Sequence, residues 1–335
     1  MIKIGIIGYG YWGPNLVRNF NGNKNFSIVK VADTRSERLN LLQKAYPLIE
    51  ITTNPNDIIK DPSIDAVAIA TPVFTHFQLA KTALENGKHV LLEKPMTSTS
   101  QEAEELIRIA SGKKLSLMVD HTFLYTGAVQ KIKQLIDSDT IGKVKYLDST
   151  RINLGLFQPD INVLWDLAPH DISILTHLVG EKPYSLNATG VSHTSNDVEN
   201  IAYLTVNFES GFIAHFNCSW TSPVKIRLML IGGDNKMIVY NDLEPTEKIK
   251  IYDTGYDIKT DEEKQNLLVD YRTGDIFIPK TAPTEALALM AEDFAQSILN
   301  GKDTVSNFNS GLSVIKILEA SNESIKNRGK EIIIK

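Results

Sequence analysis

The first third of the chain alternates short, continuous apolar runs with amphipathic stretches. Continuous apolar runs are typical of strands buried on both faces of a parallel sheet, and apolar residues that recur every three or four positions indicate helices. We therefore expect a first strand beginning at Ile2 and further strands at residues 27–32, 65–70, 88–92 and 115–119. Helices are expected between them, at residues 36–46, 75–86 and 100–111. This rhythm predicts a doubly wound parallel sheet.

The pattern changes near residue 122, where alternating apolar and polar positions replace the continuous runs. Alternation predicts a mostly antiparallel sheet with one face available for packing. Its expected strands are residues 144–152, 185–191, 201–208, 212–220, 226–231, 236–240 and 248–252. Helices are expected at residues 128–137, 285–300 and 312–327, and Thr254–Thr281 is expected to be an irregular surface excursion. The sequence thus predicts an α/β protein: a Rossmann domain in residues 1–122, and an α/β domain with a large open sheet in residues 123–335.

Composition agrees with a globular protein and excludes several kinds of partner. Of the 335 residues, 42% are hydrophobic and 22% are charged, which suits two domains with cores of their own. The net charge of −5 leaves no general basic field for nucleic acid or an acidic membrane, so the predicted partner is a small molecule. The single cysteine, Cys218, excludes an internal disulfide and is expected to be a small buried hydrophobe. A first strand at Ile2 leaves no room for a signal peptide, and no apolar run is long enough to span a membrane, so we expect a cytoplasmic protein.

Three glycines, Gly8, Gly10 and Gly13, follow the first expected strand with the spacing G-x-G-x-x-G. This spacing lets the chain turn sharply, lets backbone approach a pyrophosphate, and lets a helix pack closely on a strand. The turn also points N–H groups and the positive end of a helix dipole at an anion. Asp33 ends the next strand, where a carboxylate can accept hydrogen bonds from an adenosine ribose. Since strand, helix and acidic residue are all present, a dinucleotide site is predicted rather than a purely structural turn.

Ligands of doubly wound sheets bind beyond the carboxyl ends of the strands. Thr71-Pro72 and Glu93-Lys94-Pro95 end two further strands, so we expect them to line one crevice with the glycine turn and Asp33. Lys94 is either a solvated charge or a group that borders the nicotinamide, with Pro95 fixing the backbone there, in one interpretation through a cis peptide. His76 either faces the same crevice or merely opens the next helix.

A second candidate site is the polar cluster Trp165-Asp166-Leu167-Ala168-Pro169-His170-Asp171. If a helix runs through it, Asp166 and His170 are four residues apart and share a face. The carboxylate would then orient the imidazole and support its charged form. In the alternative interpretation, the segment is a surface helix N-terminus with Asp166 as its cap and Pro169 in its first turn. Zinc is a third interpretation, but no third ligand stands at a recognisable spacing, and no metal is predicted.

Taken in order, these motifs resemble those of the Gfo/Idh/MocA oxidoreductases. The matching residues are Gly-Tyr-Gly-Tyr-Trp-Gly at Gly8–Gly13, Asp33, Ala70-Thr71-Pro72 with His76, Gly87–Pro95, and Asp166 with His170. The resemblance covers essentially the whole chain. Glucose-fructose oxidoreductase and inositol dehydrogenase are among the family members that it resembles. The fold of this family, a Rossmann domain followed by an α/β domain with a large open antiparallel sheet, agrees with the pattern above.

The resemblance implies hydride transfer between a carbohydrate carbon and nicotinamide. The family's Glu-Lys-Pro lysine corresponds to Lys94, and its aspartate and histidine correspond to Asp166 and His170. His170 would take the hydroxyl proton, Lys94 would stabilise negative charge developing on the same oxygen, and Asp166 would orient the imidazole. Within the family, Gly10–Leu16 and Asp166–Ile172 look most like members that oxidise nucleotide-activated sugars at C3 to supply 3-amino sugars for surface polysaccharides. UDP-N-acetylglucosamine is the expected substrate.

Two sets of binding residues are expected. The cofactor contacts are Gly8, Gly10, Tyr11, Trp12, Gly13, Asp33, Thr71, Pro72, His76, Glu93 and Lys94. The substrate contacts are Tyr125, Arg151, Trp165, Trp220, Lys225 and Arg227, whose cations suit a diphosphate and whose aromatic rings suit sugar or base. Each of these has a plain surface or packing role as its alternative, because alternate strand positions face solvent. NAD is favoured by Asp33, whose carboxylate repels a 2′-phosphate, while Arg35 keeps NADP open.

Other functions remain beside sugar oxidation. They are NAD(P)H-dependent reduction of a 3-keto nucleotide sugar, oxidation of inositol or a free sugar, redox-neutral NAD-dependent glycoside cleavage, and non-enzymatic sensing of the dinucleotide. The presence of Lys94, Asp166 and His170 counts against a sensor, and no basic DNA-binding segment is visible. An uncovered sheet face in the second domain would expose a large apolar surface, so we expect a homodimer or homotetramer packed through that sheet.

Overall fold

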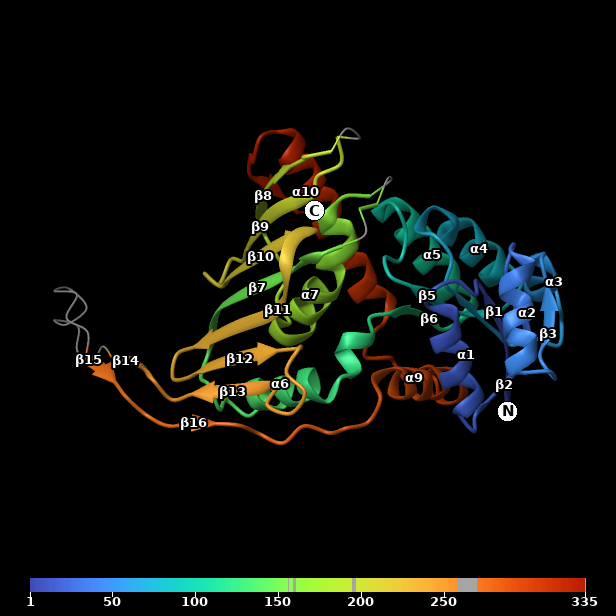
Figure 1. Cartoon of the computed structure of the whole chain (residues 1–335), viewed down its shortest axis with the longest axis horizontal. Helices are drawn as coiled ribbons and strands as arrows, with labels where there is room; N and C mark the ends of the chain where they lie inside the picture. Colours follow the sequence, from blue (N-terminus) through green and yellow to red (C-terminus); the bar gives the residue numbers. More distant parts are fainter. Residues whose placement is uncertain (156, 159–160, 195–196, 258–269, 335) are drawn as a thin grey trace. The chain divides into compact units, whose positions relative to one another are not determined.

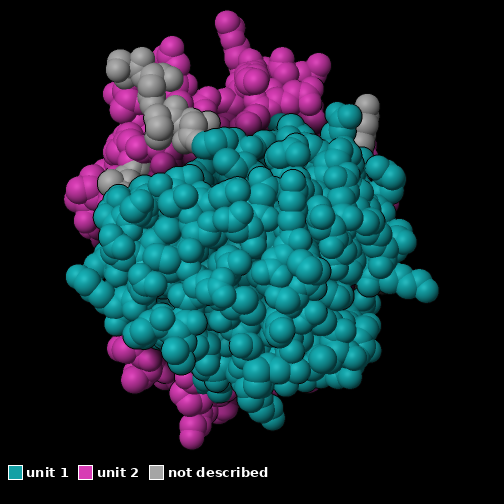
Figure 2. All heavy atoms as spheres, turned by 90° about the vertical axis from the view of Figure 1, so that its right-hand side faces the viewer, with its two compact units in different colours: residues 1–126, 284–319 teal, residues 127–283, 320–335 magenta. Residues whose placement is uncertain are grey.

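The computed structural model describes residues 1–334 except 156, 159–160, 195–196 and 258–269 (Figure 1). The chain divides into two compact units (Figure 2). Unit 1 comprises Met1–Thr126 and Thr284–Glu319, and unit 2 comprises Gly127–Pro283 and Ala320–Lys335. The sequence predicted a single boundary at residue 122. It did not predict that Thr284–Glu319 belongs to unit 1, with only the final segment in unit 2.

Unit 1 is built on a parallel sheet with the strand order β3-β2-β1-β4-β5-β6. The strands are β1 (Ile2–Ile7), β2 (Phe26–Ala32), β3 (Glu50–Thr52), β4 (Ala66–Ile69), β5 (His89–Glu93) and β6 (Leu117–Asp120). Every residue of β4 and β6 is buried, which explains their continuous apolar sequences. The predicted doubly wound sheet is therefore confirmed. The pattern missed β3, a three-residue strand too short to show a period.

Most helices of unit 1 connect these strands, and one further helix comes from near the end of the chain. They are α1 (Gly13–Gly22), α2 (Ser36–Ala45), α3 (Asn56–Ile59), α4 (Val73–Glu85), α5 (Ser100–Lys113), the 3₁₀ turn η1 (Thr122–Tyr125) and α9 (Ala286–Asn300). The start of α5 is fixed by a capping box, in which Thr99 accepts from the Glu102 N–H and Glu102 accepts from the Thr99 N–H. The Tyr125 hydroxyl donates to Asp293 at 2.7 Å and ties η1 to α9.

The described part of unit 2 contains a sheet with the order β16-β13-β12-β11-β7-β10-β9-β8-β17. Its strands are β7 (Val144–Leu154), β8 (Ser185–Val191), β9 (Ile201–Asn207), β10 (Ile213–Ser219), β11 (Thr221–Gly233), β12 (Met237–Asn241), β13 (Ile249–Tyr252), β16 (Ile276–Phe277) and β17 (Ile332–Ile333). All of its described pairings are antiparallel except that of β7 with β10. The predicted mostly antiparallel sheet is confirmed.

Helix α7 (Val163–Val179) packs on β7 and β10, with α6 (Gly127–Asp137) beside it. The alternation along the strands explains which face it covers. Phe216 and Cys218 of β10 are buried, whereas Ile213 of the same strand is 44% exposed. Cys218 is thus the small buried hydrophobe that was expected. The last helix, α10 (Phe308–Lys326), contributes residues to both units.

The segment Thr254–Thr281 was expected to be irregular, and this is wrong where its described residues form short strands. β14 (Gly255–Asp257) pairs with β15 (Asp270–Arg272), and β16 pairs with β13. These strands are two or three residues long, so cross-strand pairing rather than any apolar period defines them. Residues 258–269 lie outside the described part. Among the described helices, none combines the length and apolarity needed to cross a membrane.

Candidate functional site

The glycine turn after β1 has the geometry of a phosphate-binding loop. A Cβ at Gly8, whose φ is +100°, would lie 2.3 Å from the Ala70 carbonyl oxygen, and one at Gly13 would lie 2.4 Å from the Gly8 carbonyl oxygen. These two positions therefore require glycine for the turn and for close packing. At Gly10 the nearest atom would be Arg35 Nη2 at 3.4 Å, so packing alone does not require glycine there. The space over Gly10 fits the approach of a pyrophosphate to the backbone.

Asp33 lies at the end of β2 and is 8% exposed. Its carboxylate accepts from the Tyr9 N–H at 2.7 Å, from the Arg35 N–H at 2.9 Å, and from the Arg35 guanidinium at 3.0 and 3.2 Å. Burial raises the pKa of Asp33, but hydrogen bonds from Arg35 and Tyr9 outweigh burial and lower that pKa. Asp33 is therefore an anion held at the edge where a ribose would bind.

His76 joins the ends of two strands. It lies in the first turn of α4 and is 1% exposed. Its Nδ1 is 2.9 Å from the Pro95 carbonyl oxygen, and its Nε2 is 2.8 Å from the Thr71 carbonyl oxygen. The ring thus connects the turn after β4 to the turn after β5, where the Lys94–Pro95 peptide is cis, as one interpretation of the sequence expected.

Four polar residues gather where β5 and β6 end. Glu93 and Asp120 are neighbours across the β5–β6 ladder, and Lys94 and His121 follow them. Burial, together with the charge of Asp120, raises the pKa of Glu93 well above its usual range. Burial also raises the pKa of Asp120, although its carboxylate accepts from Trp12 Nε1 at 2.8 Å and from the Thr122 hydroxyl.

Asp120 and His121 were missed by the sequence analysis. Their signal was present, because the rule that ligands bind at strand ends applies to the strand expected at 115–119 as it does to the others. Trp12, expected as a cofactor contact, donates its indole N–H to Asp120 and so links the glycine turn to β6. Tyr11, expected beside it, is 92% exposed.

In unit 2, α7 presents Asp166 and His170 one helical turn apart. The N-cap of this helix is Asn162, whose side chain accepts from the Trp165 N–H at 3.2 Å. The alternative with Asp166 as the cap and Pro169 in the first turn is therefore wrong, since the helix begins at Val163 and Pro169 lies inside it. Asp166 accepts from the indole N–H of Trp220 at 2.9 Å.

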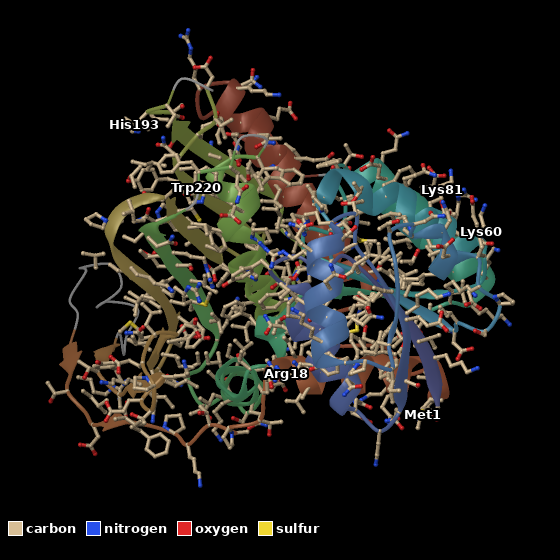
Figure 3. All side chains as sticks on the ribbon, turned by 45° about the vertical axis from the view of Figure 1, so that its right-hand side comes forward. Met1, Arg18, Lys60, Lys81, His193 and Trp220 are labelled. Carbon is tan, nitrogen blue, oxygen red and sulfur yellow. The ribbon has the colours of Figure 1, made fainter. Side chains whose placement is uncertain are left out.

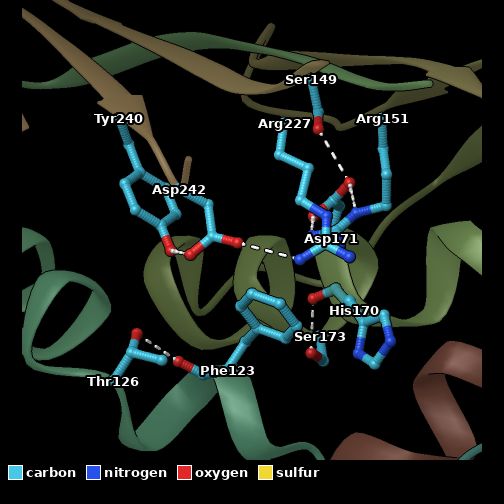
Figure 4. A network of polar contacts seen from close by, with 10 residues as sticks. All are labelled: Phe123, Thr126, Ser149, Arg151, His170, Asp171, Ser173, Arg227, Tyr240 and Asp242. Carbon is cyan, nitrogen blue, oxygen red and sulfur yellow. Dashed lines mark hydrogen bonds and ion pairs between the residues drawn. The ribbon is translucent and has the colours of Figure 1, made fainter. Parts of the chain in front are cut away.

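A buried ion pair holds α7 against β7 (Figure 4). Asp171 accepts from Arg151 Nη2 at 2.6 Å, from Arg151 Nε at 2.9 Å and from the Ser149 hydroxyl at 3.0 Å. Both charged residues are 4% exposed. Because Asp171 follows His170 directly, this bidentate pair also restrains the backbone that carries His170.

The six expected substrate contacts lie in three kinds of environment. Tyr125, Arg151 and Trp220, the last of which follows β10 (Figure 3), are at most 4% exposed and are bonded to Asp293, Asp171 and Asp166. Trp165 is 6% exposed, and its indole N–H has no acceptor among the described residues. Lys225 is exposed, and Arg227 is half-buried with Nη1 3.1 Å from Asp242.

The described residues contain no cluster of three or more His, Cys, Asp or Glu side chains suited to hold a metal ion.

Comparison with known proteins identifies the class that this fold and site define. Residues 2–121 match the model of the Gfo/Idh/MocA oxidoreductase family with NAD-binding Rossmann fold, and residues 129–239 match the Gfo/Idh/MocA C-terminal domain. UDP-N-acetylglucosamine 3-dehydrogenase of Acidithiobacillus ferrooxidans is 30% identical over 258 residues, covering 76% of this chain and 78% of the relative. The chain therefore belongs to the Gfo/Idh/MocA family, and it is an oxidoreductase with an NAD-binding domain.

Other relatives act on different alcohols by name. Scyllo-inositol 2-dehydrogenase (NADP(+)) IolW of Bacillus subtilis is 26% identical over 354 residues, covering 98% of this chain and 94% of the relative. Among solved structures, UDP-N-acetylglucosamine 3-dehydrogenase GnnA of Acidithiobacillus ferrooxidans has a TM-score of 0.82 at 24% identity, covering 97% of this chain and 98% of that chain. This last likeness concerns the fold.

Proposed function

We propose that the protein is an NAD-dependent dehydrogenase that oxidises the C3 hydroxyl of a nucleotide-activated sugar such as UDP-N-acetylglucosamine. The resulting 3-keto sugar would supply 3-amino sugar biosynthesis. The observation that carries the proposal is the ligand-binding edge of the unit 1 sheet, where the space over Gly10, the anionic Asp33 and Lys94 stand at the ends of β1, β2 and β5. The named activity of the relative from Acidithiobacillus ferrooxidans supports this choice of substrate.

Three residues are assigned to the chemistry. His170 takes the proton of the reacting hydroxyl as a general base, and Asp166, one turn earlier on α7, orients the imidazole. Lys94 donates to the same oxygen and stabilises the negative charge that develops on it as the C–H bond breaks. NAD, when bound, supplies the nicotinamide that accepts the hydride, so the hydroxyl carbon loses two electrons and becomes a ketone.

The environments of the expected substrate contacts indicate which of them would contact the substrate directly and which would act through another residue. Arg227 and Lys225 would bind the diphosphate, since one is half-buried and the other exposed, so that both can reach a ligand. Trp165 would donate its indole N–H to the substrate. Arg151 and Trp220 would act indirectly, through Asp171 and Asp166.

We propose NAD rather than NADP as the cofactor. Four donors already surround the Asp33 carboxylate, which has about four lone-pair sites. Ribose hydroxyls would therefore replace the guanidinium of Arg35, whose side chain is 47% exposed and able to turn away. Asp33 itself would repel a 2′-phosphate.

Polyol oxidation is the second candidate, favoured by the inositol dehydrogenases among the relatives. The Bacillus subtilis enzyme spans 98% of this chain, and inositol 2-dehydrogenase of Rhizobium meliloti is 23% identical over 97% of it. The same Lys94, Asp166 and His170 would serve, while Lys225 and Arg227 would have no phosphate to bind.

An absorbance assay at 340 nm tests the proposal. Purified protein would be given NAD or NADP with a panel of UDP-, GDP- and dTDP-sugars, inositol and glucose. Since oxidation at C3 can be thermodynamically uphill, 2-oxoglutarate and an aminotransferase would be present to consume the keto product. NADH formed only with a nucleotide sugar supports the proposal, and NADH formed with inositol favours the second candidate.

Silence across the panel would reject both candidates and direct attention to the other members of the class. NADH consumption with a 3-keto nucleotide sugar would indicate a reductase. Glycoside cleavage with tightly retained cofactor and no net NADH would indicate the redox-neutral hydrolase. Dinucleotide binding without any turnover would indicate a sensor.

We also propose that the protein is a homodimer or homotetramer packed through the sheet of unit 2. Tyr146, Tyr203 and Ile213 lie on the sheet face opposite the buried side chains and are 39%, 47% and 44% exposed. Ile213 pairs with Tyr146 in the β7–β10 ladder, and Tyr203 lies farther along the same face, opposite Asn217 of β10. Light scattering at micromolar concentration tests this, and a monomer would exclude it. Tyr203→Glu should shift an oligomer toward monomer.

A further inference from the structure

His121 is buried without the hydrogen bonds that buried imidazoles normally make. It directly follows β6 and is 1% exposed. Within the described part of the chain, neither Nδ1 nor Nε2 has a hydrogen-bond partner, and no other buried side chain there has two such atoms. Leaving two buried polar atoms unpaired destabilises a fold, so the position calls for a reason other than packing.

The other two histidines of unit 1, the buried His76 and the half-buried His89, show how this chain treats structural imidazoles. His76 has a main-chain carbonyl oxygen within 2.9 Å of each ring nitrogen. His89 uses Nδ1 to accept from the Ser116 N–H at 3.0 Å. Both rings connect neighbouring segments. His121 connects nothing that is described, which sets it apart as a group kept for a ligand.

Its place in the sheet puts it beside Lys94. Glu93 and Asp120 are partners across the β5–β6 ladder, and Lys94 and His121 are the next residues along their strands. Neighbouring strands are about 4.8 Å apart. Burial, together with the charge of Lys94, lowers the pKa of His121 to about 3. The ring therefore has one N–H donor and one nitrogen acceptor at neutral pH.

The strand order indicates which ligand lies there. From β2, with Asp33 for the adenosine ribose, the edge passes β1 with its glycine turn, then β4, then β5 with Lys94, and ends at β6. His121 is thus farther from the adenosine end than Lys94 is. A group beyond the reacting oxygen in this direction belongs to the substrate. A sugar hydroxyl both donates and accepts, so it can pair with either ring nitrogen.

We propose that His121 binds the substrate by hydrogen-bonding a sugar hydroxyl adjacent to the one that Lys94 holds. This inference rests on the proposed function, in which Lys94 contacts the reacting oxygen. It makes His121 a specificity residue for the position of the hydroxyl groups on the ring. Sugars that lack a hydroxyl beside the reacting carbon would leave the imidazole unpaired and bind poorly.

The variant His121→Phe tests this because it retains an aromatic ring and removes both nitrogens. We expect kcat/KM for the oxidised alcohol to fall about 10- to 100-fold, the loss of one buried hydrogen bond to substrate. NADH affinity, measured by fluorescence titration, should stay within about twofold of wild type. The urea midpoint of unfolding should be unchanged or higher, because an unpaired polar group has been replaced by an apolar one. His121→Asn, which keeps a donor and an acceptor, should recover part of kcat/KM.

His89→Phe is the matched control, because its ring makes a structural hydrogen bond. It should lower the urea midpoint and leave kcat/KM unchanged. A lower midpoint in His121→Phe, an unchanged kcat/KM, or a loss confined to NADH affinity would each overturn the proposal. If wild-type protein oxidises no alcohol, the proposed function fails independently, and equilibrium binding of UDP-N-acetylglucosamine to the NADH complex replaces kcat/KM: weaker binding in His121→Phe supports the inference, and equal binding rejects it.

Discussion

Two buried polar clusters, one in each unit, differ in how completely their hydrogen bonds are formed. In unit 2, Asp171 accepts three hydrogen bonds from Arg151 and Ser149, and these groups lie away from solvent (Figure 4). In unit 1, Glu93 and Asp120 are neighbours across the β5–β6 ladder, and the charge of Asp120 raises the pKa of Glu93 further than burial alone does. His121 beside them has no partner in the described part of the chain.

The difference separates architecture from chemistry. A buried charge whose hydrogen bonds are complete holds elements together, and removing one partner leaves the other charge buried and uncompensated. A buried group whose hydrogen bonds are incomplete weakens the fold, and sites that keep such groups use them on ligands. The Arg151–Asp171 pair thus anchors α7, whereas we propose that the cluster at the ends of β5 and β6 serves a ligand.

The largest expected effect follows from breaking the complete network. Asp171→Asn leaves the Arg151 guanidinium buried without its counter-charge, so the free energy of unfolding should fall by about 3–5 kcal/mol in urea titrations. Asp242→Asn is the matched control, because its pair with Arg227 is more exposed, at 17% and 32% of the two side chains. The control should cost less than about 1 kcal/mol. Equal losses in the two variants would contradict the contrast.

The next largest effect is expected on turnover, when Lys94 at the end of β5 is replaced. Lys94→Ala should lower turnover by about 10² or more while leaving NADH affinity nearly intact, because in the proposed mechanism the amine acts on the reacting oxygen. His170→Ala should behave alike. Lys81→Ala provides the control, since that lysine pairs with Glu105 on the surface of unit 1 and should not change turnover. Loss of NADH binding in Lys94→Ala would instead assign the lysine a structural role.

The pH dependence of stability should reveal the buried, unpaired His121. The pKa of His121 is lowered to about 3, below the unfolded value of about 6.5. The unfolded chain therefore binds a proton first as pH falls, and this histidine's contribution to stability is present above pH 6.5 and lost below it. His121→Phe lacks that loss, so its stability relative to wild type should rise by about 1.4 kcal/mol per pH unit from about pH 6 to pH 4. Glu93 and Asp120 are present in both proteins. Parallel acid limbs in urea titrations would reject the assignment.

The sequence predicted the sheets well because their apolar runs encode burial directly. The strands of unit 1 are continuous where both faces are covered, and those of unit 2 alternate where one face is. It missed β3, β14, β15, β16 and β17, whose two or three residues are too few to show a period. It also could not show that residues 284–319 belong to unit 1. The apolar face of a helix indicates that the helix packs on something, but not on which surface.

For the candidate sites, the sequence identified residues and missed partnerships. Gly8, Asp33 and Lys94 were expected to follow strands, and the structure places them after β1, β2 and β5. Arg151 was expected to contact substrate as a cation, although it shares a strand face with the buried Leu147 and Ser149 of β7. An arginine at a buried strand position needs a carboxylate, and Asp171 is separated from it by twenty residues of sequence, a distance over which pattern alone does not pair charges.

The smallest expected effect concerns the cofactor and an exposed cation. Arg35 donates to Asp33 from a side chain that is 47% exposed, so NAD can displace it at little cost, whereas NADP would use it against the 2′-phosphate. Arg35→Ala should therefore weaken NADPH binding by about tenfold and leave NADH binding within about twofold, as measured by fluorescence titration. Arg38→Ala removes the same charge from the neighbouring turn of α2 and should change neither affinity. Equal weakening of both cofactors by Arg35→Ala would mean that the guanidinium holds Asp33 in place for either one.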